Sequence, residues 1–204
     1  MRPAELWHWL RKGYLVYGAL LEVDGASQED LEALPPMKPR ALFFPGKFHV
    51  PRSLARRLNK ADFTVTFDTA FRQVVQACIR DLWGWITPGM IRLACEAFEE
   101  GWAHSCEVWL EGRLVGGVYG YGVGRVFFAE SMFHREDDMG KIALLHLVAK
   151  CFDLGFEVVD GEEMKDSLAL LGAVGCPNRE FLELAGRWLD EPTAWSPLPK
   201  ELRT

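Results

Sequence analysis

The chain of 204 residues is predicted to fold as a mixed α/β protein, and three features of its second half predict this class. Residues 106–133, CEVWLEGRLVGGVYGYGVGRVFFAESMF, contain three apolar runs separated by the turn signals Glu-Gly-Arg and Gly-Val-Gly, a pattern typical of an antiparallel meander. Residues 141–154 have helical apolar spacing, and FEVVD at 156–160 indicates a buried strand. Strand, helix and strand in this order form a βαβ unit, so the last two strands should be parallel neighbours.

The remaining elements are shorter. We expect strands at 41–44 and 62–68, and helices at 4–13, 51–60, 71–82, 88–101, 166–175 and 179–188. The acidic stretch 22–36 ends in a Pro-Pro pair, which predicts a loop with one helical turn.

The composition is that of a soluble globular protein, with 49% hydrophobic and 25% charged residues. Eight Trp, 4 Tyr and 13 Phe give too much apolar surface for a disordered chain. No apolar run approaches the roughly 20 residues of a membrane span, and the N-terminus lacks the apolar core of a secretory signal. Five cysteines without a C-x-x-C pair indicate reduced thiols, so we expect a cytoplasmic protein.

The charge is unevenly distributed along the chain. The net charge of -6 argues against a protein that coats DNA. Between residues 35 and 60, however, there is no acidic residue, and the basic residues there are Lys38, Arg40, Lys47, Arg52, Arg56, Arg57 and Lys60. This segment could contact a phosphate backbone, and the alternative is a solvated basic face.

Three carboxylates are candidates for chemistry. Asp160 ends the predicted strand FEVVD, at the edge where open α/β sheets bind ligands, and Glu162 follows two residues later. If the chain stays extended there, both carboxylates face the same side, and such a pair can supply a base for proton transfer. Glu130 ends the apolar run VFFAE, so it is a part-buried acid that needs a partner. The alternative is that the acids of DGEE only decorate a loop.

Other chemical signals are weak. Trp85, in a turn before a helix, could stack on a base or only cover the core. The five His are scattered without zinc spacing, so no metal site is expected. The glycines of G-Y-G-V-G at 120–124 lie in a hairpin turn with no helix after it, which excludes a phosphate cradle.

The ordered motifs carry a resemblance to a known family. WITPGMI at 85–91, GWAHSCEVW at 101–109, LVGGVYG at 114–120, FFAESMF at 127–133, GKIAL at 140–144 and VVDGEEMKDSLALLGA at 158–173 resemble, in this order, motifs of the bacterial leucyl/phenylalanyl-tRNA–protein transferases. The similarity runs from about residue 67 to residue 177 and is weaker upstream.

The resemblance implies transfer of leucine or phenylalanine, with methionine a further possible donor, from the 3′ acceptor end of an aminoacyl-tRNA. The acceptor would be a protein with an N-terminal Arg or Lys, which the new peptide bond marks for degradation. The family combines a small N-terminal domain with an acetyltransferase-like C-terminal domain, which the resemblance places here at residues 1–60 and 61–204. It uses neither a metal nor a coenzyme. We expect a monomer whose partners are aminoacyl-tRNA and acceptor proteins, without DNA or a membrane.

The aligned motifs also imply roles for residues. Asp160 and Glu162 become catalytic candidates, Glu130 and Trp85 lie near the substrates, and the basic segment faces the acceptor stem. The apolar pocket for the donor side chain falls on Val118, Phe127, Leu144, Leu147 and Cys151, which are also ordinary core positions in strands and a helix.

Several positions depart from the family pattern. Glu162 stands where the family has Gln, Ala129 where it has Gly, Pro88 where it has Arg and Ser167 where it has His. An ionised Glu162 cannot donate the hydrogen bonds of an amide. Two alternatives therefore stay open: a non-catalytic module that binds tRNA or protein N-termini, and an acyl-coenzyme-A acetyltransferase. The four acids in ESMFHREDDMGK would repel the pyrophosphate of coenzyme A, which disfavours the acetyltransferase.

Overall fold

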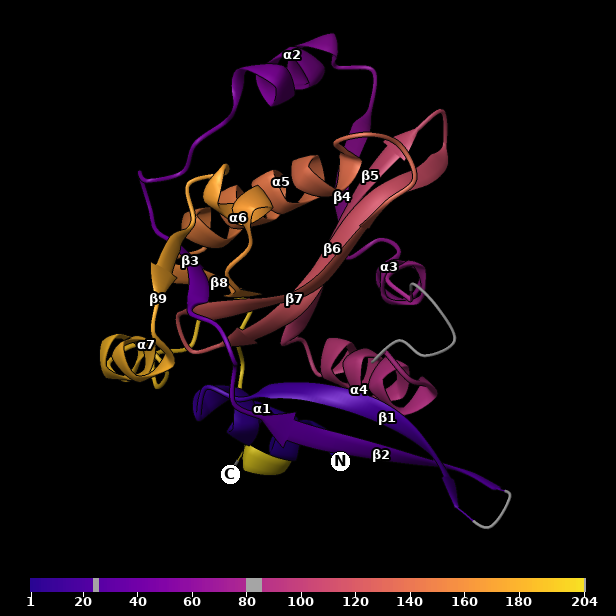
Figure 1. Cartoon of the computed structure of the whole chain (residues 1–204), viewed down its shortest axis with the longest axis vertical. Coiled ribbons are helices and arrows are strands. Elements are labelled where there is room, and N and C mark those ends of the chain that lie inside the picture. Colours follow the sequence, from indigo (N-terminus) through magenta and orange to yellow (C-terminus); the bar gives the residue numbers. More distant parts are fainter. Residues whose placement is uncertain (24–25, 80–85, 204) are drawn as a thin grey trace.

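The computed structural model, which describes residues 1–23, 26–79 and 86–203, is built around one seven-stranded sheet (Figure 1). Its strand order is β4-β5-β6-β7-β8-β3-β9. The strands are β3 (Arg40–Phe43), β4 (Thr64–Phe67), β5 (Ala103–Leu110), β6 (Arg113–Val123), β7 (Val126–His134), β8 (Val158–Glu163) and β9 (Val174–Cys176). All neighbours pair antiparallel except β7 and β8, which are parallel.

Helices cover both faces of this sheet. On one face, which we call the α5 face, lie α5 (Met139–Asp153), α2 (Arg52–Lys60) and α6 (Asp166–Ala169), whose apolar side chains share one buried cluster. On the other, the α4 face, lie α1 (Pro3–Arg11), α3 (Phe71–Ala77), α4 (Pro88–Glu99) and α7 (Asn178–Ala185), which form a second cluster. A 3-10 turn, η1 (Lys200–Leu202), follows near the C-terminus.

A separate two-stranded hairpin, β1 (Leu15–Val23) and β2 (Ala26–Leu34), lies beneath α4, at the end of the molecule opposite α2 (Figure 1). Its strands contact α4, and Glu29 of β2 hydrogen-bonds the backbone N–H of Gly89. The prediction of a loop with a helical turn over 22–36 is therefore wrong. The residues of β2, ASQEDLEAL, have low strand propensity, and the pairing with β1 overrides it.

The second half follows the prediction closely. The meander is formed by β5, β6 and β7, the helix by α5, and β8 is parallel to β7, which confirms the mixed α/β class. Gly116 lets α5 lie close to the sheet, because a Cβ at this position would come within 2.6 Å of the backbone of Met139.

The predicted helix over 166–175 is wrong beyond its first turn. The structure has α6 up to Ala169, a break at Gly172 and then β9. Gly172 has a φ of +92°, and a Cβ there would lie 2.5 Å from the carbonyl oxygen of Lys47. The close approach of the segment before α2 thus ends the helix.

The division at residue 60 stays a prediction. One strand of the predicted N-terminal part, β3, belongs to the central sheet, where it lies between β8 and β9. Within the described ranges, no helix combines the length and the apolar character needed to cross a membrane.

Candidate functional site

The parallel pairing of β7 and β8 is short and ends beside three acidic side chains. The two strands pair only from Val126–Val158 to Phe128–Asp160. Glu130 and Glu162 lie two residues beyond the last pair. On its other side, β7 has a bulge at Glu130, because Ser131 pairs with Tyr119 while Ala129 pairs with Gly120. A bulge re-aims the side chain of the extra residue, which here is Glu130.

Asp160 is fully buried and forms an ion pair with the equally buried Arg40. The Nε of Arg40 donates to Oδ2 of Asp160 at 2.7 Å, and its Nη2 lies 2.5 Å from the same oxygen. The other oxygen, Oδ1, accepts a hydrogen bond of 3.0 Å from the backbone N–H of Glu162. Burial raises the pKa of Asp160 and Arg40 counteracts this shift.

The position of Arg40 corrects its assignment to a tRNA-binding surface. Its side chain has no exposed area, and its guanidinium is bonded to Asp160, to the carbonyl of Gly13 and to Asn178. A side chain enclosed in this way cannot reach a phosphate on the surface. In the sequence, Arg40 is one of several cations in a basic segment, and nothing in this pattern indicates that its partner is Asp160.

Glu162 does not continue a regular strand. It lies within β8, but its φ is +61°, so the chain is not regularly extended from Asp160 to Glu162. The side chain nevertheless interacts electrostatically with both Glu130 and Asp160. We call Glu130, Asp160 and Glu162 the carboxyl cluster.

Burial and neighbouring carboxylates disfavour the ionised forms of Glu130 and Glu162. Burial, followed by the negative charge of Asp160, raises the pKa of Glu130 to about 8. Burial and the charges of Glu130 and Asp160 raise the pKa of Glu162 well above its usual range. The described residues offer the Glu130 side chain no hydrogen bond. Near neutral pH, the cluster therefore holds protons that it can exchange.

Tyrosines surround the carboxyl cluster. The buried hydroxyl groups of Tyr119 and Tyr121 on β6 have no hydrogen-bond partner among the described residues. Both sense the charges of Glu130 and Glu162. From β1, Tyr17 faces the same acids, and burial together with Glu162 raises its pKa to about 12. Neither buried tyrosine was singled out from the sequence, where alternating residues of a strand only predict core positions.

The five residues predicted to form the donor pocket lie together on the opposite face of the sheet. Each is at most 2% exposed, and all belong to the apolar cluster of the α5 face: Val118, Phe127, Leu144, Leu147 and Cys151. Arg40 and Asp160 instead lie on the α4 face, since the guanidinium is 4.6 Å from the ring centre of Phe181. The candidate pocket and the pair of Arg40 and Asp160 therefore lie on opposite faces of the sheet.

The rest of the basic segment is on the surface. Lys38, Lys47, Arg52, Arg56 and Lys60 are exposed. Arg52, Arg56 and Lys60 follow one another at intervals of four residues and so share one side of α2. Arg57 lies beside this side, but it is partly buried, pairs with Asp62 and covers the ring of Phe63.

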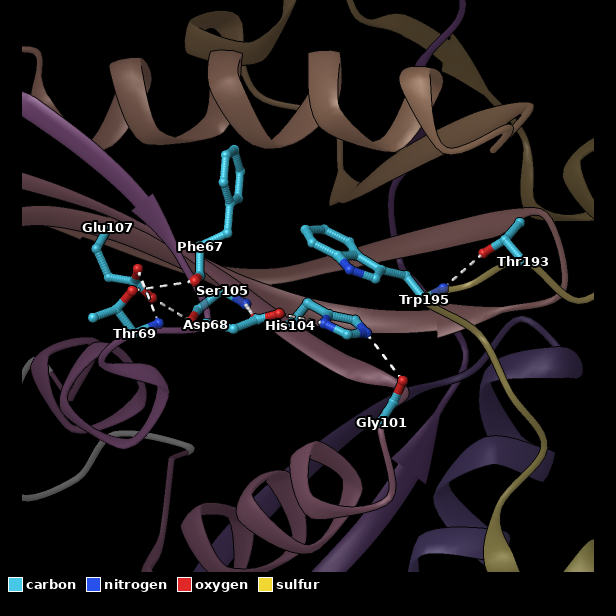
Figure 2. Close-up of polar contacts among 9 residues, drawn as sticks. All are labelled: Phe67, Asp68, Thr69, Gly101, His104, Ser105, Glu107, Thr193 and Trp195. Carbon is cyan, nitrogen blue, oxygen red and sulfur yellow. Dashed lines mark hydrogen bonds and ion pairs between the residues drawn. The ribbon is translucent and has the colours of Figure 1, made fainter.

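Ser105 and His104 on β5 and Asp68 directly after β4 have the residue types of a hydrolase triad but not the geometry (Figure 2). Nδ1 of His104 lies 2.8 Å from Asp68, while Nε2 contacts the carbonyl oxygen of Gly101 at 3.1 Å. The hydroxyl of Ser105 donates to Glu107 instead of to the histidine. In a triad the histidine would accept the proton of the serine hydroxyl. Both ring nitrogens of His104 instead contact other groups, so the geometry does not support a serine nucleophile activated by a histidine.

Two expectations concern other sites. Trp85 lies outside the described residues. In the described part of the chain, no three His, Cys, Asp or Glu side chains are arranged to hold a metal ion.

The comparisons with known proteins point to one family. Residues 42–186, more than half of the chain, match the family model described as leucyl/phenylalanyl-tRNA protein transferase. A protein of that name from Salinibacter ruber is 41% identical over 160 residues, which are 78% of this chain and 71% of the relative. One from Chromohalobacter salexigens is 42% identical over 165 residues, which are 79% of this chain and 64% of the relative.

Solved structures also show similarity. A GCN5-related N-acetyltransferase from Kribbella flavida matches with a TM-score of 0.46 and 14% identity. The match covers 68% of this chain and 54% of that one.

Proposed function

Since the chain belongs to the leucyl/phenylalanyl-tRNA protein transferase family, we propose that it transfers an amino acid from aminoacyl-tRNA to a protein. The donor residue is leucine or phenylalanine, with methionine as a further candidate, and the acceptor is an N-terminal Arg or Lys. The observation that carries this proposal at the level of chemistry is the carboxyl cluster, two buried acids and the half-buried Glu162, which have raised pKa values and lie where β7 and β8 stop pairing.

The reaction is an aminolysis of an ester that is already activated. The α-ammonium of the acceptor gives up a proton, its nitrogen attacks the ester carbonyl carbon, and a C–N bond forms. The C–O bond to the terminal ribose breaks, and the ribose hydroxyl leaves with a proton. An unperturbed α-amine has a pKa of about 7.7–8.0, so a carboxylate whose pKa is raised to about 8 is well matched to accept its proton.

The charge of the cluster supports a cationic acceptor. Glu130, Asp160 and Glu162 bring three acids together, and Arg40 is the cation in direct contact with one of them. The α-ammonium and the side chain of an N-terminal Arg or Lys would offset the negative charge that forms when Glu130 or Glu162 releases its proton. The aromatic rings of Tyr17, Tyr119 and Tyr121 can flank such cations.

The donor side chain would enter the apolar cluster of the α5 face. Val118 and Phe127 come from β6 and β7, and Leu144, Leu147 and Cys151 come from α5. A leucine or phenylalanine side chain matches this lining, because it is apolar and has no hydrogen-bonding group to satisfy. The strand ends beyond Phe128 and Asp160 would then bring the ester carbonyl to the carboxyl cluster on the other face.

The exposed side of α2 would contact the tRNA backbone. Arg52, Arg56 and Lys60 share this side, and α2 contains no acidic residue. A row of cations along one helix suits a row of phosphates. The buried Arg40 is not part of this surface.

The test is a transfer assay with labelled Leu-tRNA and Phe-tRNA and a peptide that begins with Arg. We expect a labelled product in which the donor precedes the Arg. The same peptide with an acetylated N-terminus is the matched control, because its α-nitrogen cannot attack. Binding of aminoacyl-tRNA without transfer to either peptide would contradict the enzyme and favour the binding module.

A further inference from the structure

Arg40 is the central contact of the site, although it lies on none of the predicted catalytic positions. Its guanidinium contacts Asp160 on β8, the carbonyl oxygen of Gly13 after α1 at 3.0 Å, and Oδ1 of Asn178 at the start of α7 at 3.1 Å. The rings of Phe181 and Phe128 lie 4.6 Å and 5.8 Å from it. One side chain thus joins the N-terminal segment, the sheet and the C-terminal helix.

The three acids of the carboxyl cluster differ in their access to this cation. Asp160 receives the guanidinium directly through Nε and Nη2. Glu130 and Glu162 interact with Arg40 only through space, as a weaker influence than burial and the neighbouring carboxyl groups. A buried carboxylate needs a partner to remain ionised, and within the cluster only Asp160 has one in contact.

This asymmetry assigns roles within the cluster. We propose that Arg40 is a positioning residue for the transfer reaction, which holds Asp160 as the fixed anion and leaves Glu130 to exchange a proton with the acceptor amine. This inference rests on the proposed function. In it, Asp160 attracts the ammonium and orients Glu162 through the backbone N–H of that residue, while Arg40 does not touch the substrate.

Several other charged or titratable groups surround the carboxyl cluster. Those that interact with Asp160, Glu130 or Glu162 come from four strands and the segment after β8, and they are Tyr17, Arg40, Tyr119, Tyr121, Lys165 and Cys176. Arg40 and Lys165 are the cations in this set, and Lys165 is exposed. Loss of Arg40 therefore leaves the buried acids without a buried counter-charge.

The experiment compares Arg40→Gln and Arg40→Lys with the wild type in the transfer assay across pH. We expect Arg40→Gln to lower kcat at least about tenfold near neutral pH and to move the pH profile upward by about one unit, because Asp160 then keeps its proton. The KM for aminoacyl-tRNA should change less than about twofold, since the donor site is elsewhere. Arg40→Lys keeps the charge and should restore the position of the profile.

Arg125→Gln is the matched control. Arg125 also bridges distant segments, since it bonds Glu157, Glu191 and the carbonyl of Gly155, but it lies at the opposite end of the β7–β8 pairing. Its replacement should lower stability without moving the pH profile. Equal effects of Arg40→Gln and Arg125→Gln on kcat and on the profile would overturn the inference and leave Arg40 a structural residue.

A double variant covers the possibility that Arg40→Gln fails to fold. Arg40→Gln with Asp160→Asn removes both buried charges, so it should be more stable than Arg40→Gln and no less active than Asp160→Asn alone. Additive losses of activity would contradict the inference.

If the wild-type protein transfers no amino acid, the proposed function is contradicted. A second measurement then still tests whether Arg40 holds Asp160 as an anion. In protein with ¹³C-labelled carboxyl groups, the titration of Asp160 should move to higher pH in Arg40→Gln. An unchanged titration would overturn the positioning role in an active or an inactive protein.

Discussion

Two groups of buried acids lie on the same sheet, and they differ in how their charge is satisfied. Glu107 on β5 has no exposed area, and it accepts a hydrogen bond from the hydroxyl of Thr66. It also accepts hydrogen bonds from the hydroxyl of Ser105 and the N–H of Thr69 (Figure 2). Glu130 on β7 is only 6% exposed and receives no hydrogen bond from the described residues. The first acid is held by three donors, whereas the second has none in place.

This difference indicates a structural role for Glu107 and a functional role for Glu130. A buried carboxylate with a full set of donors stabilises the packing around it. A buried carboxylate without donors costs stability, and a protein retains such a group where it serves a ligand. The same substitution, Glu to Gln, should therefore have opposite consequences at Glu107 and at Glu130.

The largest effect is expected for Glu130→Gln on the transfer rate. The amide cannot accept a proton from the acceptor ammonium, so kcat should fall at least about tenfold, as for the loss of a general base. The measurement is single-turnover transfer from Phe-tRNA to an Arg-peptide. Loss of activity in Glu107→Gln to the same extent would contradict the comparison.

The pH dependence of stability should differ in the same way. Because the folded protein holds protons on the carboxyl cluster that the unfolded chain has lost, the free energy of unfolding should decrease as pH rises from about 4.5 to the raised pKa of about 8. One such group contributes about 1.4 kcal/mol per pH unit over this window. Glu130→Gln should flatten the slope, as measured by urea unfolding at several pH values. A wild-type stability that rises over this range would show that the cluster is ionised.

Glu107→Gln should act on stability alone. The amide leaves at least one of the three donors without an acceptor, which costs about 1–3 kcal/mol of unfolding free energy at neutral pH. The rate of transfer per folded molecule should stay unchanged, since Glu107 lies on β5, apart from β7 and β8. Thermal unfolding and the transfer assay on the same preparation test both statements.

A third group of charges, the exposed side of α2, forms no ion pair among the described residues. Replacement of Arg52, Arg56 and Lys60 by Ala should weaken tRNA binding and flatten its salt dependence by about 0.7–0.9 units for each lost phosphate contact. The control replaces Arg113, Arg179 and Arg187, which are also exposed but lie elsewhere. An equal loss of tRNA affinity in both variants would mean that binding depends only on the net charge of the protein.

The sequence predicted the second half of the fold better than the site. The alternation and turn signals of β5, β6 and β7 and the apolar spacing of α5 are local, and these elements agree with the structure. The β1–β2 hairpin was missed because its second strand depends on pairing and on contacts with α4. Local propensity does not contain such tertiary information.

At the site, the sequence predicts the three acids of the carboxyl cluster but not their contacts and backbone geometry. Asp160, Glu162 and Glu130 stood out because each acid ends or follows an apolar run. The ion pair between Arg40 and Asp160 joins residues 120 positions apart, and the charge pattern around Arg40 suggested a different partner. The bulge at Glu130 and the positive φ of Glu162 likewise have no signal in the local sequence pattern.

The smallest effect is expected for Glu162→Gln, and it tests whether the cluster tolerates a carboxyl where the resembling family has an amide. Burial and its acidic neighbours raise the pKa of Glu162 well above its usual range, so near neutral pH it carries an O–H donor and a C=O acceptor, as an amide does. Glu162→Gln should therefore change kcat by less than about twofold at neutral pH, where the two groups are equivalent in hydrogen bonding. At higher pH the wild type loses this donor and the variant keeps it, so the variant should retain activity where the wild-type rate declines. A kcat profile for both proteins measures this directly. If the wild type transfers nothing at any pH and Glu162→Gln restores transfer, the carboxyl at position 162 has abolished catalysis, and the native protein is a binding module derived from a transferase.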